Sequence, residues 1–563
     1  MKSFLRLSLL LMLSTALITS CKKAVPKQTR HIPKDAVFVS MINTKSLQGK
    51  LVKEQTTIEN ILKSVTGSDT SVEKGRKEWE DLKAAGIDLD ENFYVAVVQK
   101  GGGMSGQGTI VSSALGTLKD GAKLEAYIKK KDPEAEIRKE KEYTYTTVHG
   151  DKMVAWGGDL VIVMSYQKSF ANAMEYDSAT GSYNFKQPVN AENDMKTEMQ
   201  TYFNLQESES VAAIPEFRDL MQDKADASMW INSSSSMENL PLPLPKLKEL
   251  FANSFTAAKI NFEDGKITFG SKSYYSKQLR DILKQYPGTD ANLGLVENYP
   301  SDNIDGFAVA AFNPEVINGI VRYLEVGGMV DAYLTRMMGS NFTLQDALKA
   351  IKGDFAAIVS DFAMPVKDSA APMMRNQIPD VQMIVNVPVG DNVQMNKLMD
   401  KLVEMQMMVK SGNQYRLGAA MQQTGWQVVV DDKNLLVASS EALLTQYRAK
   451  SKKAGINKDV MNDFKGKPGV AYLNIENILN AVPAGKDAEA NNVIAKAKET
   501  FKDLKAYSES FNGKYMEAHA EIRFKNEKEN SLSSLLHFAE AVSRNIKRND
   551  MPPPGMDSMM DGQ

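Results

Sequence analysis

The sequence predicts an α+β fold formed by a tandem duplication of two similar halves, each an antiparallel sheet of hairpins with helices packed over one face. One observation behind this prediction is a pattern in which an apolar run ends in asparagine and leads into a helix-like segment. The pattern occurs at residues 36–51, 227–240, 307–321 and 470–482, with Asn43, Asn232, Asn313 and Asn474 at the turn. Asparagine suits this position because its side chain caps the first turn of a helix.

The second observation is that the segments between these copies match in the same order. The matched pairs are residues 108–128 with 381–399, 152–174 with 425–447, and 257–275 with 517–534. In the first pair a strand precedes an amphipathic helix, and in the second a hairpin precedes a serine and a helix. Because the strands are rich in aliphatic residues and alternate only partly, we expect each sheet to be largely covered on one side.

Composition and turn signals divide the chain into five parts. We predict a signal peptide at 1–20, a lipidated cysteine and tether at 21–35, a first α+β half at 36–290, a second α+β half at 300–545, and a disordered Met/Pro-rich tail at 546–563. The connection between the halves is rich in Pro, Gly, Asn and Asp, which favours a loop. The tail has too little apolar surface to fold by itself.

The amino-terminal segment has the features of an export signal with a lipid attachment site. Lys2 and Arg6 are followed by an apolar stretch of residues 7–18, which is too short to cross a bilayer comfortably. The stretch runs into Ile18-Thr19-Ser20-Cys21, which resembles the lipobox of bacterial lipoproteins. In those proteins the cysteine thiol takes a diacylglyceryl group and the peptide is cut before it. The resemblance implies that Cys21 is the lipidation site. The alternative is an ordinary secretory signal followed by a chance cysteine.

The residues around this cysteine also bear on where the protein resides. Cys21 is the only cysteine, so the mature chain beyond it has no internal disulfide or thiolate site. Lys22 and Lys23 stand where some lipoproteins carry an acidic surface-export cluster or an aspartate that retains them at the inner membrane. We therefore expect an outer-membrane lipoprotein on the periplasmic face, with display on the cell surface left open. The formal net charge of -2 gives no electrostatic reason to expect nucleic acid as a partner.

Two longer motifs carry a family resemblance. The segments HIPKDAVFVSMINTKSLQGK (31–50), behind the lipobox, and IKGDFAAIVSDF (351–362) resemble the Bacteroidetes lipoproteins classed as domain of unknown function 4836. The resemblance covers nearly the whole mature chain. Its motifs are strand-and-turn motifs, so it implies architecture and lineage but no activity and no site residues.

A search for catalytic or metal-binding patterns gives no strong candidate. The four histidines, His31, His149, His519 and His537, lack the spacing of helical metal ligands. The sequence contains no GxSxG nucleophile elbow. With 70 acidic residues, a carboxylate pair of the glycosidase kind stays open. We therefore predict that the protein is not an enzyme and has no metal site and no cofactor.

The best candidate for an interaction surface is a pair of long loops. Residues 101–108 are glycine-rich, and residues 363–380 are long and polar with Met and Pro. Both lie between two predicted strands at matching places of the two halves, and loops on a rigid scaffold often carry binding functions.

Together these features predict a noncatalytic, lipid-anchored cell-envelope protein that serves as a binding or assembly scaffold. Its expected partners are the membrane, through the lipid on Cys21, and an envelope protein or a glycan; nucleic acid is not expected. The alternatives are a surface protein that captures glycans or peptides and, less favoured, a carboxylate-based hydrolase.

Overall fold

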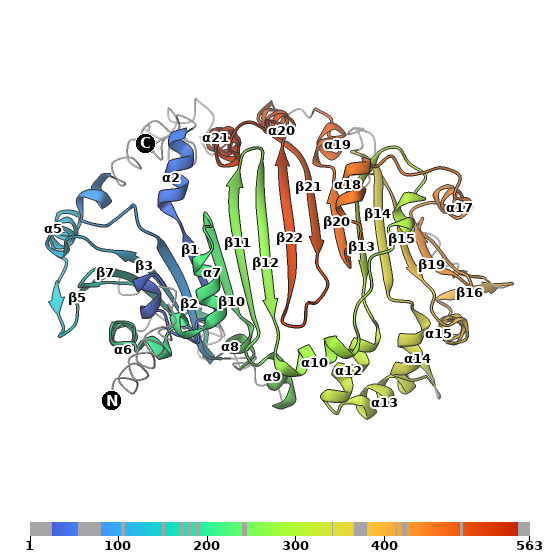
Figure 1. Ribbon diagram of the computed structural model, residues 1–563, viewed down its shortest axis with the longest axis horizontal. Coiled ribbons are helices and arrows are strands. Elements are labelled where there is room, and N and C mark those ends of the chain that lie inside the picture. The colour runs from blue at the N-terminus through green and yellow to red at the C-terminus, as the bar shows by residue number, and fades with distance from the viewer. Residues whose placement is uncertain are drawn as a thin grey trace, which may run out of the picture. The chain divides into compact units, whose positions relative to one another are not determined.

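The computed structural model describes most of the chain. The described residues are 25–53, 80–102, 107–148, 152–168, 174–177, 182–185, 192–238, 245–339, 342–364, 380–412, 414–418, 425–484 and 488–549. Tertiary contacts divide the chain into two compact units. Unit 1 contains Met1–Thr44 and Lys83–Leu240, and unit 2 contains Lys45–Leu82 and Pro241–Gln563. Each unit is a mixed α and β structure and is described by itself; Figure 1 labels the elements.

The sheet of unit 1 is antiparallel throughout. Its strand order is β10 (Ala227–Asn232), β1 (Phe38–Ile42), β2 (Phe93–Gly102), β3 (Gln107–Thr117), β7 (Leu160–Lys168), β6 (Lys152–Gly157), β5 (Thr144–Val148) and β4 (Arg138–Lys139). A separate pair is formed by β8 (Met174–Asp177) and β9 (Ser182–Phe185). The amino-terminal strand β1 lies between β2 and β10. This pairing joins strands that are far apart in the sequence.

Helical segments of unit 1 pack on both faces of this sheet. They are η1 (Lys27–His31), α5 (Gly121–Lys131), α6 (Glu192–Asn204), η4 (Glu207–Glu209), η5 (Val211–Ala213), α7 (Pro215–Gln222) and α8 (Ser233–Glu238). The ring of Phe217 on α7 meets the ring of Trp230 edge-on, with 5.5 Å between their centroids, and both side chains are fully buried. On the opposite face Leu124 of α5 packs with Trp156 and Val161, while Val95 and Val163 stay about 40% exposed.

The sheet of unit 2 is also antiparallel. Its strand order is β11 (Phe255–Glu263), β12 (Lys266–Tyr274), β22 (Tyr515–Phe524), β21 (Phe501–Ser508), β20 (Gly469–Leu473), β13 (Ile304–Ala311), β14 (Asp354–Ala363), β15 (Asp380–Pro388), β19 (Asn434–Ala438), β18 (Gln427–Val430), β17 (Gln414–Leu417) and β16 (Met408–Ser411). The hairpin β11–β12 is joined to the carboxy-terminal hairpin β21–β22 through the pairing of β12 with β22.

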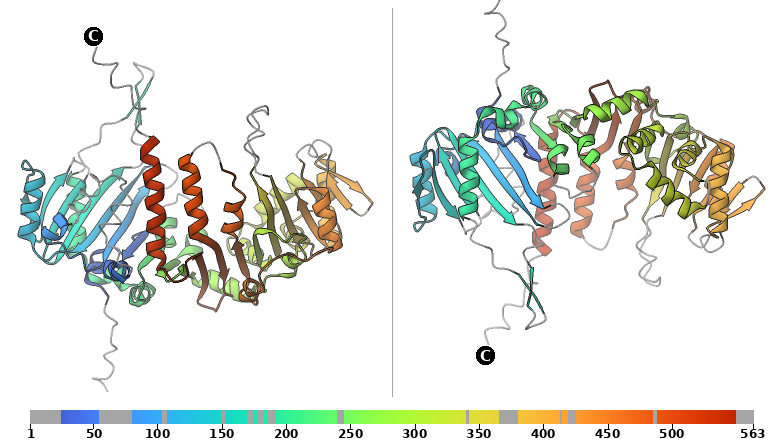
Figure 2. Two further views of the ribbon diagram at one scale, coloured as in Figure 1. Left: turned by 90° about the horizontal axis from the view of Figure 1, so that it is seen from above. Right: turned by 90° about the horizontal axis from the view of Figure 1, so that it is seen from below.

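Helices of unit 2 pack on both faces of its sheet. They are α2 (Thr44–Lys53), α9 (Pro245–Phe251), α10 (Lys277–Gln285), α11 (Gly294–Glu297), α12 (Glu315–Tyr323), α13 (Gly327–Met338), α14 (Leu344–Ala350), α15 (Asn392–Glu404), α17 (Glu441–Ala449), α18 (Lys458–Asp463), α19 (Ile475–Asn480), α20 (Ala488–Thr500) and α21 (Ser531–Asn549). Leu444 of α17 and Val460 of α18 join a buried cluster with Val309 of β13. On the other face, α20 and α21 lie side by side, as Figure 2 shows. The prediction of helices over one face therefore holds for neither unit.

The recurrent strand–asparagine–helix pattern is confirmed at all four places. Strands β1, β10, β13 and β20 each lead through the asparagine into a helix. The Asn474 side chain accepts a hydrogen bond from the backbone N–H of Asn477 at 3.1 Å, and Asn232 accepts one from Ser235 at the same distance. These bonds satisfy amide groups that have no partner inside the first helical turn.

The two sheets share a pairing order. The strands β13 to β20 of unit 2 correspond, in chain order, to β1 to β7 and β10 of unit 1. Corresponding strands have corresponding neighbours in the two sheets. One predicted match is wrong, however. Residues 257–275 form the hairpin β11–β12, whereas 517–534 contain most of β22 and the start of α21. The hairpin that follows β20 is β21–β22, and the sequence comparison missed its first strand because charged residues interrupt the apolar pattern.

Other boundaries also differ from expectation. Residues 25–35 were predicted to lie in a tether, but Thr29 and Ile32 are fully buried in unit 1. The tail was predicted from residue 546, yet α21 continues to Asn549. The contact boundary near residue 240 precedes β11, because the β12–β22 pairing places that hairpin in unit 2. Units defined by tertiary contacts need not coincide with repeats of the sequence. The halves at 36–290 and 300–545 therefore stay a prediction.

Several predicted features lie outside the described residues. These are the signal peptide at 1–20, Cys21, the centres of the loops 101–108 and 363–380, and residues 550–563. Within the described part of the chain, no helix combines the length and the apolar character needed to span a membrane.

Candidate functional site

A pocket of about 390 Å³ lies in unit 2 on the side chains of β12, β21 and β22. Helix α18 and the turn after it supply Asp463, Phe464 and Lys467 to its wall. Phe464 is fully buried and belongs to the hydrophobic cluster of unit 2, so the pocket is backed by the core at this side. Its volume is within the range of about 300–1,000 Å³ that is typical of small-molecule sites.

Strand register arranges the floor of the pocket in rows. Alternate residues of a strand point to the same face, so residues two apart on each strand line the pocket. Across β21, β22 and β12, the aligned residues are Tyr507, His519 and Gly270 in one row, Lys505, Glu521 and Thr268 in the next, and Asp503, Arg523 and Lys266 in the third. Gly270, Asp503 and Arg523 adjoin the pocket without lining it. The rows place aromatic residues at one end and opposite charges at the other.

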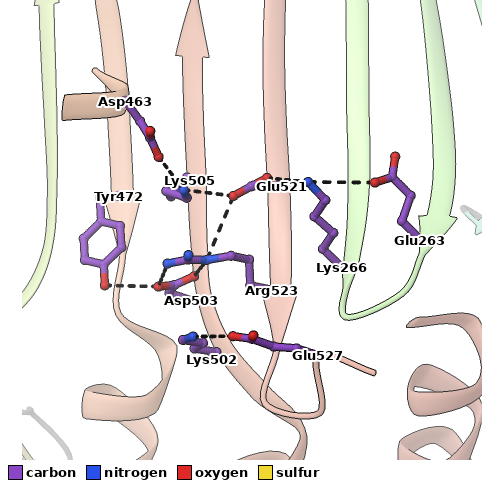
Figure 3. Close-up of polar contacts among 10 residues, drawn as sticks. All are labelled: Glu263, Lys266, Asp463, Tyr472, Lys502, Asp503, Lys505, Glu521, Arg523 and Glu527. Carbon is purple, nitrogen blue, oxygen red and sulfur yellow. Dashed lines mark hydrogen bonds and ion pairs between the residues drawn. The ribbon is translucent and has the colours of Figure 1, made fainter. Parts of the chain in front are cut away.

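The third row contains a buried ion pair. Arg523 Nε donates to Asp503 Oδ1 at 2.5 Å, and Arg523 Nη2 bonds the other carboxylate oxygen. The Tyr472 hydroxyl from β20 also donates to Asp503, at 3.3 Å. Burial, together with the negative charge of Asp503, raises the pKa of Tyr472, so the phenol stays protonated. Figure 3 shows these three side chains meeting across neighbouring strands.

Lys505 ties helix α18 to the strands. Its ammonium group lies 2.7 Å from Asp463 of α18 and 3.0 Å from Glu521 of β22. Burial opposes the charge on Lys505, but its hydrogen bonds to Asp463 and Glu521 outweigh that effect and raise its pKa. Glu521 also lies 3.4 Å from Lys266, which continues the network onto β12 (Figure 3).

The first row forms an aromatic wall. The His519 imidazole stacks on the Tyr507 ring, with 5.0 Å between centroids and an interplanar angle of 29°. Lys467 Nζ lies 4.7 Å from the Tyr507 ring centroid and pairs with Glu509. Gly270 faces His519 from β12, and a Cβ added there would meet only ordinary contacts, the nearest at 3.5 Å from Lys259. The Lys259 side chain therefore lies against Gly270 and fills this position.

The charges of the pocket compensate one another. Lys266 and Lys505 both lie within 4 Å of Glu521, and Lys467 is paired with Glu509. The arrangement places paired charged groups beside an aromatic surface. Across the described ranges, no group of three or more His, Cys, Asp or Glu side chains is placed to hold a metal ion.

The structure separates the residues that the sequence singled out. His519 lies in the pocket, whereas His31 contacts the Tyr202 carbonyl in unit 1, and His537 of α21 lies 3.2 Å from Glu529. Cys21, His149 and the centres of the two predicted interaction loops lie outside the described residues. Sequence reasoning missed Tyr507, Lys505 and Arg523. The alternating charged and aromatic residues of FKDLKAYS (501–508) and YMEAHAEIRF (515–524) were the available signal.

Comparison with known proteins gives one extensive match. Residues 29–532 match the family model described as "Domain of unknown function (DUF4836)". No curated protein matches the chain. Among solved structures, crystal forms IV and III of TP0453 are each 11% identical and cover 45% of this chain, with 83% and 82% of TP0453 aligned. Both have a TM-score of 0.24, a level of similarity that carries no argument about fold or function.

Proposed function

The chain belongs to the family described as domain of unknown function 4836, and we propose that it is a noncatalytic, lipid-anchored cell-envelope protein that binds or helps to assemble another envelope component. The observation that carries the binding role is the pocket of unit 2, where paired charges and an aromatic wall are held on rigid strands. Fixed polar groups beside an apolar surface are what recognition sites require.

The proposed anchor is the lipid on Cys21. The support is the sequence Ile18-Thr19-Ser20-Cys21 behind an apolar stretch. A second support is that buried residues begin shortly after Cys21. Val25 is already buried, so only residues 22–24 separate it from Cys21. Because an extended chain spans at most about 3.5 Å per residue, a lipid on Cys21 would hold Val25 within about 14 Å of the acylated residue. We place the protein at the periplasmic face of the outer membrane.

We further propose that the architecture arose by tandem duplication of one α+β half. Support comes from the shared pairing order of β1 to β10 in unit 1 and β13 to β20 in unit 2, and from the asparagine that follows four of these strands. A crystal structure tests this directly: the two halves should superpose over most of their strands, and failure to superpose would remove the duplication.

The function is tested in native cells with the full chain carrying a carboxy-terminal tag. We expect the wild-type protein to incorporate labelled fatty acid and to sediment with outer membranes, and Cys21→Ser to lose both properties. Crosslinking followed by capture should recover a reproducible envelope component with the wild type. An acyl-labelled, membrane-bound Cys21→Ser protein would overturn the anchor, and turnover in a broad hydrolase screen would overturn the noncatalytic role.

A further inference from the structure

We propose that the sheet of unit 1 binds a long-chain fatty acid on its open face, with the hydrocarbon chain across the strands and the carboxylate at Lys152. The open face is the side of this sheet that carries Val95 and Val163, opposite to the side where Tyr94 and Val98 are buried. The site is separate from the pocket of unit 2, and the proposed function does not depend on it.

The open face is apolar where a sheet face in contact with water is normally polar. Five aliphatic residues on it are 38–43% exposed, one on each of five neighbouring strands: Ile42 of β1, Val95 of β2, Ile110 of β3, Val163 of β7 and Ile231 of β10. Single exposed aliphatic residues are common on protein surfaces, but a group of them on one face indicates a binding surface.

The strand registers join these residues into two bands that cross the sheet. The first band contains Met229, Ser40, Val95, Ala114 and Val163. The second contains Ile231, Phe38, Val97, Ser112, Ser165 and Lys152. Beyond Val163 the first band reaches Val154, which packs in the cluster of α5, so its exposed part ends at β7.

The length of the first band matches an extended acyl chain. Neighbouring strands lie about 4.8 Å apart, so the five strands from β10 to β7 span about 19 Å. A saturated chain of sixteen carbons, with carbon–carbon bonds of about 1.5 Å, has about the same extended length. The chain would therefore lie across the strands, on the aliphatic side chains.

The exposed apolar area favours one acyl chain over a second copy of this protein. Five aliphatic side chains that are about 40% exposed offer on the order of 200 Å², from roughly 60–120 Å² per fully exposed side chain. One side of a sixteen-carbon chain covers about 250 Å², at roughly 30 Å² per methylene. A stable dimer needs about 800 Å² on each partner. The area therefore fits a single hydrocarbon chain and is too small to hold two proteins together.

The charge distribution over the two bands indicates where the carboxylate lies. Lys152, at the start of β6, carries the only charge among the residues of the two bands. It is exposed, and within the described part of the chain no hydrogen bond or ion pair engages its ammonium group. Its neighbour in the second band is Ser165, whose hydroxyl is a further hydrogen-bond donor. A carboxylate there gains a charge-assisted hydrogen bond, while the chain lies over the uncharged part of the face.

The inference is tested with the full mature chain carrying Cys21→Ser, so that no attached lipid competes for the open face. Palmitate displaces bound cis-parinaric acid, a fluorescent fatty acid, in a titration. We expect its affinity to fall at least tenfold in Val95→Asp and in Val163→Asp, because each places a charge under the hydrocarbon chain. Val393→Asp is the matched control, since Val393 is 63% exposed on α15 of unit 2, and it should bind as the parent does.

The position of the carboxylate is tested with 1-hexadecanol, an uncharged molecule of the same chain length. Lys152→Gln should weaken the binding of palmitate at least fivefold and leave the binding of 1-hexadecanol unchanged. Lys453→Gln, at an exposed lysine of unit 2, should change neither. A Lys152→Gln protein that binds palmitate as the parent does would overturn the assignment of the carboxylate to Lys152.

The remaining outcomes decide the occupant of the open face. Urea unfolding identifies an aspartate variant that does not fold, and the other aspartate variant then decides the result. Absence of displacement by micromolar palmitate, or parent-like binding in the aspartate variants, would overturn the fatty-acid inference. A dimer in sedimentation that Val95→Asp abolishes, without palmitate binding, would instead assign the face to a second copy. Each of these outcomes leaves the proposed function standing, because fatty-acid labelling and capture in cells test it separately.

Discussion

Arg523 binds the buried carboxylate of Asp503 through both of its oxygens, from the neighbouring strand of the same hairpin. The Asp503 side chain is only 5% exposed, so solvent can hardly replace this partner. We predict that Arg523→Met lowers the free energy of unfolding by about 3–5 kcal/mol, because an unpaired carboxylate then remains buried. Replacing both residues, as Arg523→Met with Asp503→Leu, should cost much less. Urea unfolding of the single and double variants measures the difference.

The exposed ion pair of Lys502 and Glu527 provides the matched control. Its nitrogen and oxygen lie 2.9 Å apart, but the side chains are 38% and 72% exposed. Lys502→Met should therefore cost less than about 1 kcal/mol. A loss at Lys502 equal to that at Arg523 would contradict the view that burial, rather than pairing itself, makes the Arg523 contact important.

A second prediction concerns the pH dependence introduced by Asp305. This carboxyl is 2% exposed; its Oδ2 accepts the Phe362 N–H at 2.7 Å, and burial and then the charge of Asp361 raise its pKa. Since the folded-state pKa lies above the unfolded value, folding binds a proton and stability falls as the pH rises through this interval. Lowering the pH from 7 towards 4 should therefore increase the stability of the wild type relative to Asp305→Asn.

The Asp305 measurement is a comparison of two unfolding curves at each pH. Other carboxyl groups titrate in both proteins, and their contributions cancel in the difference between them. The side-chain amide oxygen of the substituted asparagine can still accept the Phe362 N–H, so the local bond is retained. A difference in unfolding free energy that stays constant between pH 7 and pH 4 would show that Asp305 ionises in the folded protein as it does in the unfolded one.

The sequence predicted local elements better than it predicted the site. Asn232 and Asn474 identified strand-to-helix turns because their capping chemistry is local. The tether was misplaced because residues 25–35 have a polar composition, although Ile32 is buried against unit 1. The composition of a segment does not indicate whether it contacts residues that are distant in the sequence.

The pocket depends on registers that join distant parts of the chain. Gly270 and His519 are opposite each other only because β12 pairs with β22. Lys505 reaches Asp463 only because α18 packs beside β21, and each residue in isolation has the appearance of an ordinary surface residue. Charged residues in FKDLKAYS also concealed β21 itself. Polar and apolar residues alternate along this strand, so it lacks the apolar run by which strands were recognised. The same alternation places its polar side chains in the site.

A third prediction concerns Gly353 in the motif IKGDFAAIVSDF. Its φ is +107°, and a Cβ there would lie 2.1 Å from the carbonyl oxygen of Phe312. Gly466 also has a positive φ, +73°, but a Cβ added there meets nothing within 4 Å. Gly466→Ala should cost about 1 kcal/mol, the strain of a left-handed alanine, whereas Gly353→Ala should cost more than about 3 kcal/mol because backbone must also move. Similar urea midpoints for both variants would contradict the close approach at Gly353.

The last prediction separates capping from burial at Asn474. Its side chain accepts the Asn477 N–H, while its own backbone N–H bonds the Asp305 carbonyl at 2.7 Å, a contact that substitution leaves intact. Asn474→Ala should lower the free energy of unfolding by about 1 kcal/mol, and Asn474→Asp should restore most of it, because aspartate caps equally well. Amide hydrogen exchange at Asn477 adds a local readout. Its protection should fall in the alanine variant and return with aspartate. Unchanged protection in Asn474→Ala would mean that packing of α19 against the sheet, rather than the cap, holds this turn.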